Sequence, residues 1–173
     1  MFTPRHVLIT VTAALACLAF SAQAAEAVYV AKMDGAQNLP EPIKTAATGE
    51  VILKVSADRK KVAYKVTVDK LANIGSADLH LGGDSQNGPL IVKLWPHGAP
   101  AKKGEFSGVL AEGTFDAGDF LGSMAGSPMS DLLEELQAGS VYVNVHTNDG
   151  VDPPNSGPGD YRLGEIRGQL KPQ

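Results

Sequence analysis

Apolar and polar residues alternate along most of the chain after residue 27, in short runs separated by turn-forming residues. Alternation with a period of two is typical of β-strands that bury one face. Alternating or short apolar runs occur at 27–33, 50–56, 61–69, 77–82, 90–95, 104–115, 141–147 and 165–171. The turn sequence "ADRKK" joins the second and third runs, which therefore predict a β-hairpin. "ANIGS" separates the third run from the fourth, so these two are expected to be different strands.

One stretch follows a helical pattern instead, "SPMSDLLEELQAG" at 127–139. Its leucines recur at the spacing of one helix face, as in an amphipathic helix. Ser127 is expected to cap this helix and Gly139 to end it, which predicts a helix at about 128–138. Short strands with a single helix in a connection predict an all-β fold, an antiparallel sandwich or barrel. No internal repeat or linker is visible, so residues 25–173 are expected to form one domain.

The first 24 residues have the pattern of a secretory signal peptide. Arg5 precedes an apolar run from Val7 to Phe20, and Ala22-Gln23-Ala24 is a small-x-small cleavage pattern. The apolar run is shorter than the roughly 20 residues of a membrane-spanning helix, and no later stretch qualifies. Cleavage would also remove Cys17, the only cysteine; lipidation of Cys17 is the alternative, although Ala14 stands where a larger aliphatic residue is usual. The sequence predicts a secreted or periplasmic protein with no integral membrane segment after signal removal.

Charge and motifs narrow the function classes further. The chain has 15 basic and 19 acidic residues, and residues 1–24 hold one basic residue and no acidic one, so the mature net charge is −5. This balance gives no basic surface for nucleic acid or for an anionic membrane. No G-x-S-x-G nucleophile motif, phosphate-binding loop or dinucleotide fingerprint occurs. No catalytic residue is therefore assigned, and the sequence favours a non-enzymatic protein.

Two histidines and an aspartate carry the candidate chemistry. In "ADLHLG", strand geometry places Asp78 and His80 on one face about 7 Å apart, so both can reach one metal ion. In the run at 141–147 the valines share the face assigned to the core, which puts His146 on the opposite face. Carboxylate and imidazole suit zinc or copper, so Asp78, His80 and His146 form a candidate metal site. The alternative is that both histidines only form hydrogen bonds at strand ends; His97, in "WPHGAP", is expected in a loop.

Three further polar residues lie on strands next to this candidate site. Asn144 shares the face of His146, and Glu165 and Arg167 share one face of the last strand, with Ile166 pointing inward. One hypothesis is that Glu165 or Arg167 orients His146 from a neighbouring strand, as partners of metal ligands do. The ordinary alternative is a structural role, a cross-strand ion pair or an exposed charged face.

The segments "ADLHLGGDSQNGPLIVKL", "LLEELQAGSVYVNVHT" and "GEIRGQL", in this order, resemble the CHRD domain family. The resemblance extends over about residues 28–171 and implies an extracellular, immunoglobulin-like β-sandwich or barrel without established catalytic activity. The family commonly has His-x-His where this chain has Asp78 and His80, so only His80 matches there, while His146 matches the "VHT" histidine. "GEIRG" at Gly164–Gly168 matches as well. A looser similarity to copper-zinc superoxide dismutase concerns the architecture alone, because the mature chain has too few histidines for both of its metals.

These observations leave three hypotheses open. The leading one is a secreted, non-enzymatic CHRD module that binds an unknown protein or extracellular ligand. The second is a copper- or zinc-binding sandwich protein that uses Asp78, His80 and His146. The third is a structural protein of a matrix or surface layer, which would self-associate.

Overall fold

The computed structural model describes residues 26–95 and 102–173. Within these ranges the strands are β1 (Val28–Asp34), β2 (Thr48–Val55), β3 (Lys61–Leu81), β4 (Leu90–Trp95), β5 (Lys102–Asp116), β6 (Val141–Thr147), β7 (Ile166–Gln169) and β8 (Lys171–Pro172). The helical elements are α1 (Met129–Gln137) and the short 3-10 turns η1 (Gly35–Gln37), η2 (Ala117–Asp119) and η3 (Gly122–Met124). Every strand pairing is antiparallel, which confirms the predicted all-β fold with a single short α-helix.

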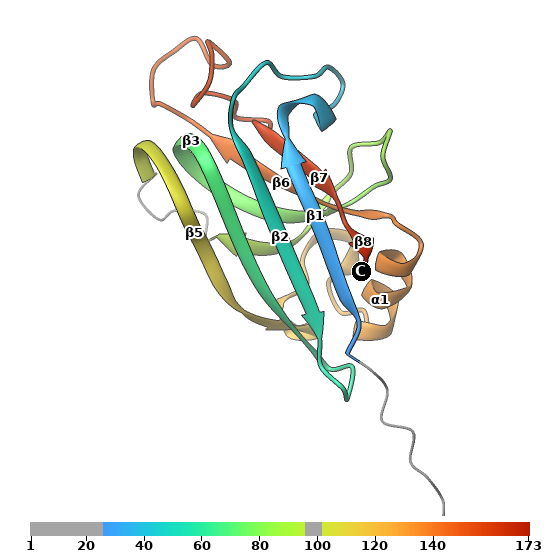
Figure 1. The fold of residues 1–173 in the computed structure, drawn as a ribbon. Helices are drawn as coiled ribbons and strands as arrows, with labels where there is room; N and C mark the ends of the chain where they lie inside the picture. Colours follow the sequence, from blue (N-terminus) through green and yellow to red (C-terminus); the bar gives the residue numbers. More distant parts are fainter. Residues whose placement is uncertain (1–25, 96–101) are drawn as a thin grey trace, which may run out of the picture.

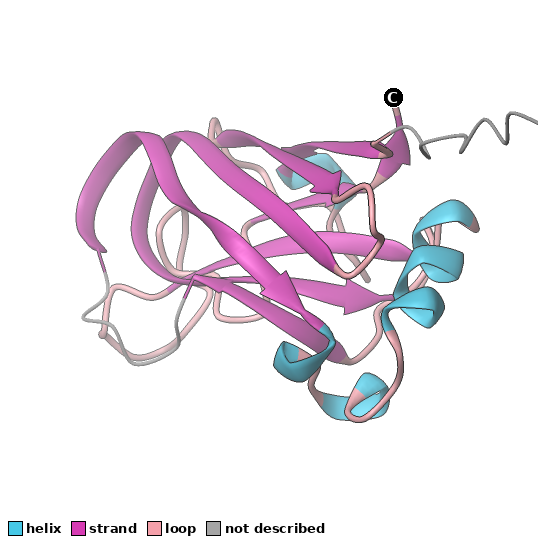
Figure 2. Cartoon of the chain, turned by 90° about the horizontal axis from the view of Figure 1, so that it is seen from below, coloured by secondary structure: helices cyan, strands magenta, loops and turns pink. Residues whose placement is uncertain are grey.

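The long strand β3 closes the sheet into a barrel (Figure 1). Its first part pairs with β2 and β5, and its last part, Ile74–Leu81, pairs with β6. Since β2 also reaches β6 through β1 and β7, the five strands β1, β2, β3, β6 and β7 form a ring. In Figure 2 the strands curve around the core in two layers, and most of the helical segments gather at one end.

The expected division between strands at 61–69 and 77–82 is wrong, because β3 continues through "ANIGS". Lys70 and Asn73 adopt positive φ angles of 53° and 52°, and the pairing with β5 shifts register at both places. Extra residues of this kind form β-bulges, which bend a strand without ending it. The turn residues in the sequence therefore bend β3 from one partner strand to the next.

Valines and leucines fill the interior of the barrel. The inward residues of β6, Val141, Val143 and Val145, are fully buried, as are Ala77 and Leu79 of β3. Burial of each of these valine and leucine side chains contributes about 1.5–3 kcal/mol, so this face holds the strands together. The valine face of the run at 141–147 is therefore in the core, as predicted.

Helix α1 covers the end of the barrel where β1 begins (Figure 1). It buries Leu132, Leu133 and Leu136, the predicted apolar stripe. It ends before Gly139, whose φ of 71° favours glycine. The expected cap by Ser127 is not formed, because Pro128 occupies the N-cap position, where no side chain supplies a capping hydrogen bond.

The outward face of β3, β6 and β7 is polar and yet largely buried. Asp78 pairs with Asn144, which in turn pairs with Arg167, so these side chains form a row across three strands. The exposed fractions of Asp78, Asn144 and Arg167 are 0%, 5% and 2%. The loops at 82–89 and 148–165 bond to this row, so they cover it. The exposed charged surface considered for Glu165 and Arg167 is therefore not found, since Glu165 is also buried, at 1%.

Glu165 fastens two of the connecting segments to the barrel. Its carboxylate accepts hydrogen bonds from the Thr45 hydroxyl, the Thr147 hydroxyl and the Gly159 main-chain N–H, each at 2.7 Å. Its main-chain carbonyl accepts a further bond from the Asn38 amide. A buried carboxylate with several donors is stable only while those donors remain in place. Glu165 therefore links the connection after β1 and the 148–165 loop to the end of β6.

We expect Glu165→Gln to lower the free energy of unfolding by about 2 kcal/mol, because the new amide N–H₂ would face donors where an acceptor is required. Urea denaturation followed by tryptophan fluorescence or circular dichroism measures the change. Glu112→Gln, at an exposed position of β5, is the matched control and should change stability by less than about 0.5 kcal/mol. Equal effects of the two substitutions would contradict the role given to Glu165.

Candidate functional site

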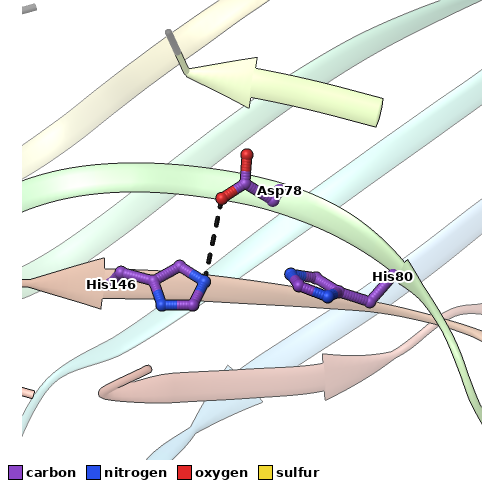
Figure 3. Close-up of side chains that lie close together, drawn as sticks. All are labelled: Asp78, His80 and His146. Atoms are coloured by element: carbon purple, nitrogen blue, oxygen red, sulfur yellow. Dashed lines mark ion pairs between the residues drawn. The ribbon is translucent and has the colours of Figure 1, made fainter. Parts of the chain in front are cut away.

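Adjacent positions on β3 and β6 bring Asp78, His80 and His146 together. In the register of these strands His80 lies opposite Tyr142 and His146 lies opposite Ser76, with Asp78 between them on β3. The two histidines lean toward each other, so their ring centroids are 5.9 Å apart (Figure 3). One ligand atom from each of the three residues lies within 4.8 Å of the others. The structure therefore assembles the three residues that the sequence singled out.

Main-chain carbonyl groups fix which nitrogen of each histidine faces the cluster. His80 Nδ1 lies 3.0 Å from the Gly88 oxygen, and His146 Nδ1 lies 3.0 Å from the Arg162 oxygen. A carbonyl oxygen only accepts hydrogen bonds, so each Nδ1 carries the proton and donates it. In a neutral imidazole the lone pair then resides on Nε2. Both histidines thus have the tautomer in which Nε2 is the available ligand atom.

The two Nε2 atoms have different surroundings. His146 Nε2 lies 3.7 Å from Asp78 Oδ2, a contact drawn in Figure 3 that becomes an ion pair when His146 is protonated. His80 Nε2 is buried and has no hydrogen-bond partner among the described residues. A buried nitrogen lone pair without a donor is costly unless another group, such as a metal ion, occupies its direction.

Asp78 supplies the negative charge of the cluster. Its side chain is fully buried, and the Ser76 hydroxyl donates to Oδ2 at 2.9 Å. A buried carboxylate beside two imidazoles is a donor set that suits zinc or copper. The arrangement can therefore coordinate a divalent transition metal through two nitrogens and one oxygen.

A stack of side chains holds His80 in place. The His80 ring stacks on Tyr142, with centroids 5.1 Å apart and an interplanar angle of 15°. Arg167 lies over the Tyr142 ring at 3.8 Å and donates to the carbonyl oxygens of Gly83 and Gln86. Arg167 is thus placed next to the partners of His80, whereas the sequence hypothesis linked it with His146.

The same stack positions the loop that bonds to His80. The Gly88 N–H donates to the Tyr142 hydroxyl at 3.1 Å, and Arg167 donates to three oxygen atoms of the same loop, the main-chain oxygens of Gly83 and Gln86 and the Asn87 side-chain oxygen. Gly88 in turn provides the carbonyl that accepts from His80. The turn signal "NG" identifies this loop in the sequence, but the role of the Gly88 carbonyl depends on the fold and has no signal of its own.

Asn144 and Gly164 place the loop that bonds to His146. The Asn144 amide donates to the Leu163 carbonyl at 3.0 Å, next to Arg162. Gly164 has a φ of 120°, and a Cβ there would collide with the Asn144 side chain. Close contact between this glycine and Asn144 therefore sets the position of the Arg162 carbonyl. Glu165 accepts hydrogen bonds from Thr147, the residue after His146, and from Gly159 in the loop that follows. It therefore helps to hold the chain next to His146 in place.

A pocket of about 370 Å³ lies against the cluster, and Asp78, His80 and His146 form part of its wall. Gly75 and Leu90 also line it. The His146 side chain keeps 21% of its surface exposed, so the cluster is accessible from the pocket. This size falls within the range of small-ligand sites.

Burial lowers the pKa of His80 below its usual value. The charges of His146 and Arg167 act in the same direction, while the Gly88 carbonyl and Asp78 oppose it. His80 is therefore neutral over a wider pH range in the folded protein than in the unfolded chain. A neutral ring is the form that can ligate a metal.

In metal-free protein we expect acidification from about pH 7 to about pH 5 to lower the free energy of unfolding, because the unfolded chain protonates His80 first. His80→Gln keeps a donor for the Gly88 carbonyl and removes the titrating group. Its unfolding free energy should consequently change less over the same interval, measured by urea denaturation in the presence of a chelator. Identical pH slopes for the two proteins would contradict this assignment.

The signal peptide at 1–24 and the loop assignment of His97 lie outside the described residues. Among the residues that are described, no helix has the length and apolar character needed to cross a membrane.

A comparison with protein-family models matches residues 29–154 to the CHRD domain. The match spans most of the chain and includes Asp78, His80 and His146. It ends before Gly164–Gly168, so the similarity of "GEIRG" to the family stays a prediction. Searches of curated proteins and of solved structures gave no match.

Proposed function

Because the chain belongs to the CHRD domain family, we propose that it is an exported, non-enzymatic binding module that acts in the periplasm or outside the cell. The observation that carries this proposal is the pocket beside Asp78, His80 and His146, whose polar groups are held in place by buried hydrogen bonds. A few preorganised polar groups in a concave site are typical of ligand recognition.

The contacts of the cluster support binding over catalysis. Ser76 carries a hydroxyl group beside the cluster, and this hydroxyl donates to Asp78. Nucleophilic catalysis would need a hydroxyl that donates to a histidine acting as base. Because the Ser76 proton is directed to the carboxylate, the serine is arranged as a support for Asp78.

Export can be tested from the start of the mature chain. We expect the protein expressed from its full sequence in a bacterial host to be recovered from the periplasm or medium with Ala25 as its first residue. Intact mass and N-terminal sequencing measure this, and replacement of Ala22 and Ala24 by bulky residues should block cleavage. Recovery of an uncleaved chain in the cytoplasm would contradict export.

Metal binding is a second candidate function, favoured by the convergence of the three ligand atoms. The carbonyl bonds at both Nδ1 atoms direct both Nε2 lone pairs to the cluster, and the buried His80 Nε2 lacks a hydrogen-bond partner among the described residues. A zinc or copper ion would accept both lone pairs and offset the charge of Asp78. If the metal is bound, the module binds its partner while the ion occupies the site of Asp78, His80 and His146.

We expect protein prepared without chelators or a His-tag to contain about one zinc or copper ion per chain, as elemental analysis measures. The double variant His80→Ala/His146→Ala should lose the ion, because it removes both imidazole ligands of the cluster. Asp149→Asn, at an exposed carboxylate of the neighbouring loop, is the control and should keep it.

A metal-free wild-type protein that takes up neither ion on dialysis, with a double variant that is only less stable, would contradict the metal site. The cluster would then be structural, and the pocket alone would remain as the binding site.

A further inference from the structure

We propose that the domain forms a two-fold dimer in which the outer edges of two copies of β5 pair in antiparallel orientation. The partner on this surface is therefore a second copy of the chain. The contact is independent of the pocket and of the proposed metal site, because β5 carries none of the three candidate ligands.

Strand β5 lies at an edge of the sheet. Among the residues that the structure describes, β3 is the only strand paired with β5, and the two lie side by side in Figure 1. β5 is 15 residues long, and most of these residues are exposed or half-buried. The main-chain N–H and C=O groups along the outer edge of a strand can form a ladder with a further strand. This edge is therefore long enough and open enough to accept one.

An exposed valine lies near the middle of the edge. Val109 pairs with Thr67 of β3, and 44% of its surface is exposed. The residues on either side of Thr67, Val66 and Val68, are buried, so Thr67 and Val109 face away from the core. In an antiparallel pair that is centred on this position, Val109 lies directly opposite Val109 of the second copy. Each valine then covers apolar surface of the other.

The β-bulge in β5 sets the register of this pair. Leu110 is one residue more than β3 has at this point. In a pair centred on Val109, each Leu110 bulge lies opposite Gly108 of the other copy, which has no side chain to obstruct it. The outward residues that then lie opposite each other are Ser107 and Glu112, Glu105 and Thr114, and Lys103 and Asp116.

The charges of β5 favour the antiparallel orientation. The strand begins with Lys102 and Lys103, and its second half contains Glu112 and Asp116. In antiparallel orientation the basic start of one β5 lies beside the acidic end of the other, at both ends of the contact. Opposite charges across neighbouring strands are favourable, whereas a parallel arrangement would bring like charges together. The same surface is thus complementary to itself, as a two-fold interface requires.

Sedimentation velocity of the chain from Ala25 onward, with a chelator present and from micromolar to near-millimolar protein, tests the dimer. We expect a reversible shift from monomer to dimer with no larger species, because each β5 edge is used once. Val109→Lys should raise the dimer dissociation constant several-fold, because two lysines would lie opposite each other at the two-fold axis. Val151→Lys, at an exposed valine of the 148–165 loop, is the matched control and should dimerise like the wild type.

Disulfide cross-linking tests the register. Cys17 is the only cysteine of the sequence, so a chain that starts at Ala25 and carries one introduced cysteine has a single thiol. Val109→Cys should form a covalent dimer on mild oxidation, because opposite Cβ atoms in such a pair are about 5 Å apart. Glu112→Cys, at an exposed position farther from the axis on the same strand, should remain largely monomeric. Both variants should keep the circular dichroism spectrum of the wild type.

A wild-type chain that stays monomeric at every concentration would overturn the proposed dimer. A Val109→Lys variant that dimerises like the wild type, or cross-linking of Glu112→Cys equal to that of Val109→Cys, would overturn the pairing of β5 edges. Species that keep growing beyond the dimer would overturn the closed two-fold arrangement in favour of an open array. Each of these results would leave the pocket and the metal site as they stand.

Discussion

The carboxylate of Glu165 is the interaction on which the polar side of this domain depends. It is buried beside the end of β6, and its three donors come from the connection after β1, from β6 and from the 148–165 loop. The connection after β1 is more than 90 residues away from the other two segments in the sequence. A buried charge imposes the requirement that all three donors be present together, which a nonpolar contact would not. The loop that bonds to His146 is therefore positioned by electrostatics as much as by packing.

The two faces of β6 show how stability and recognition are divided. The inward valines are fully buried and contribute hydrophobic stabilisation, which does not depend on precise orientation. The outward residues Tyr142, Asn144 and His146 each bond to a loop, and these bonds depend strongly on geometry. The barrel thus supplies a rigid support, and the hydrogen bonds of the outer face define the site built on it.

Much of this fold could be predicted from the sequence because its causes are local. Alternation located the strands, and the leucine spacing located α1, since each depends on residues near one another in the chain. The same alternation placed Asp78 with His80 on one face and His146 on the corresponding face of β6. The continuity of β3 could not be predicted, because bulges at Lys70 and Asn73 depend on pairing with β5, a strand distant in sequence.

The rest of the site depends on contacts with loops and main-chain groups, which cannot be predicted from residue types alone. The burial of Glu165 and Arg167 results from loops that fold back over their strand, so an i, i+2 pair of charges looked like an exposed face. The acceptors at His80 and His146 are main-chain carbonyls, which every residue has, and so no residue type marks them. Side-chain patterns therefore identified the ligating residues and missed the groups that orient them.

The use of main-chain acceptors has a consequence for how this domain can diverge. Because Arg162 meets His146 through its carbonyl, any residue that preserves the backbone path could occupy that position during evolution. The number of residues between Thr147 and Glu165 is constrained much more strongly. A deletion there would move the Arg162 carbonyl away from His146 and the Gly159 N–H away from Glu165. Descendants of this sequence can thus acquire new loop surfaces around an unchanged site, provided that they conserve the length of the loop.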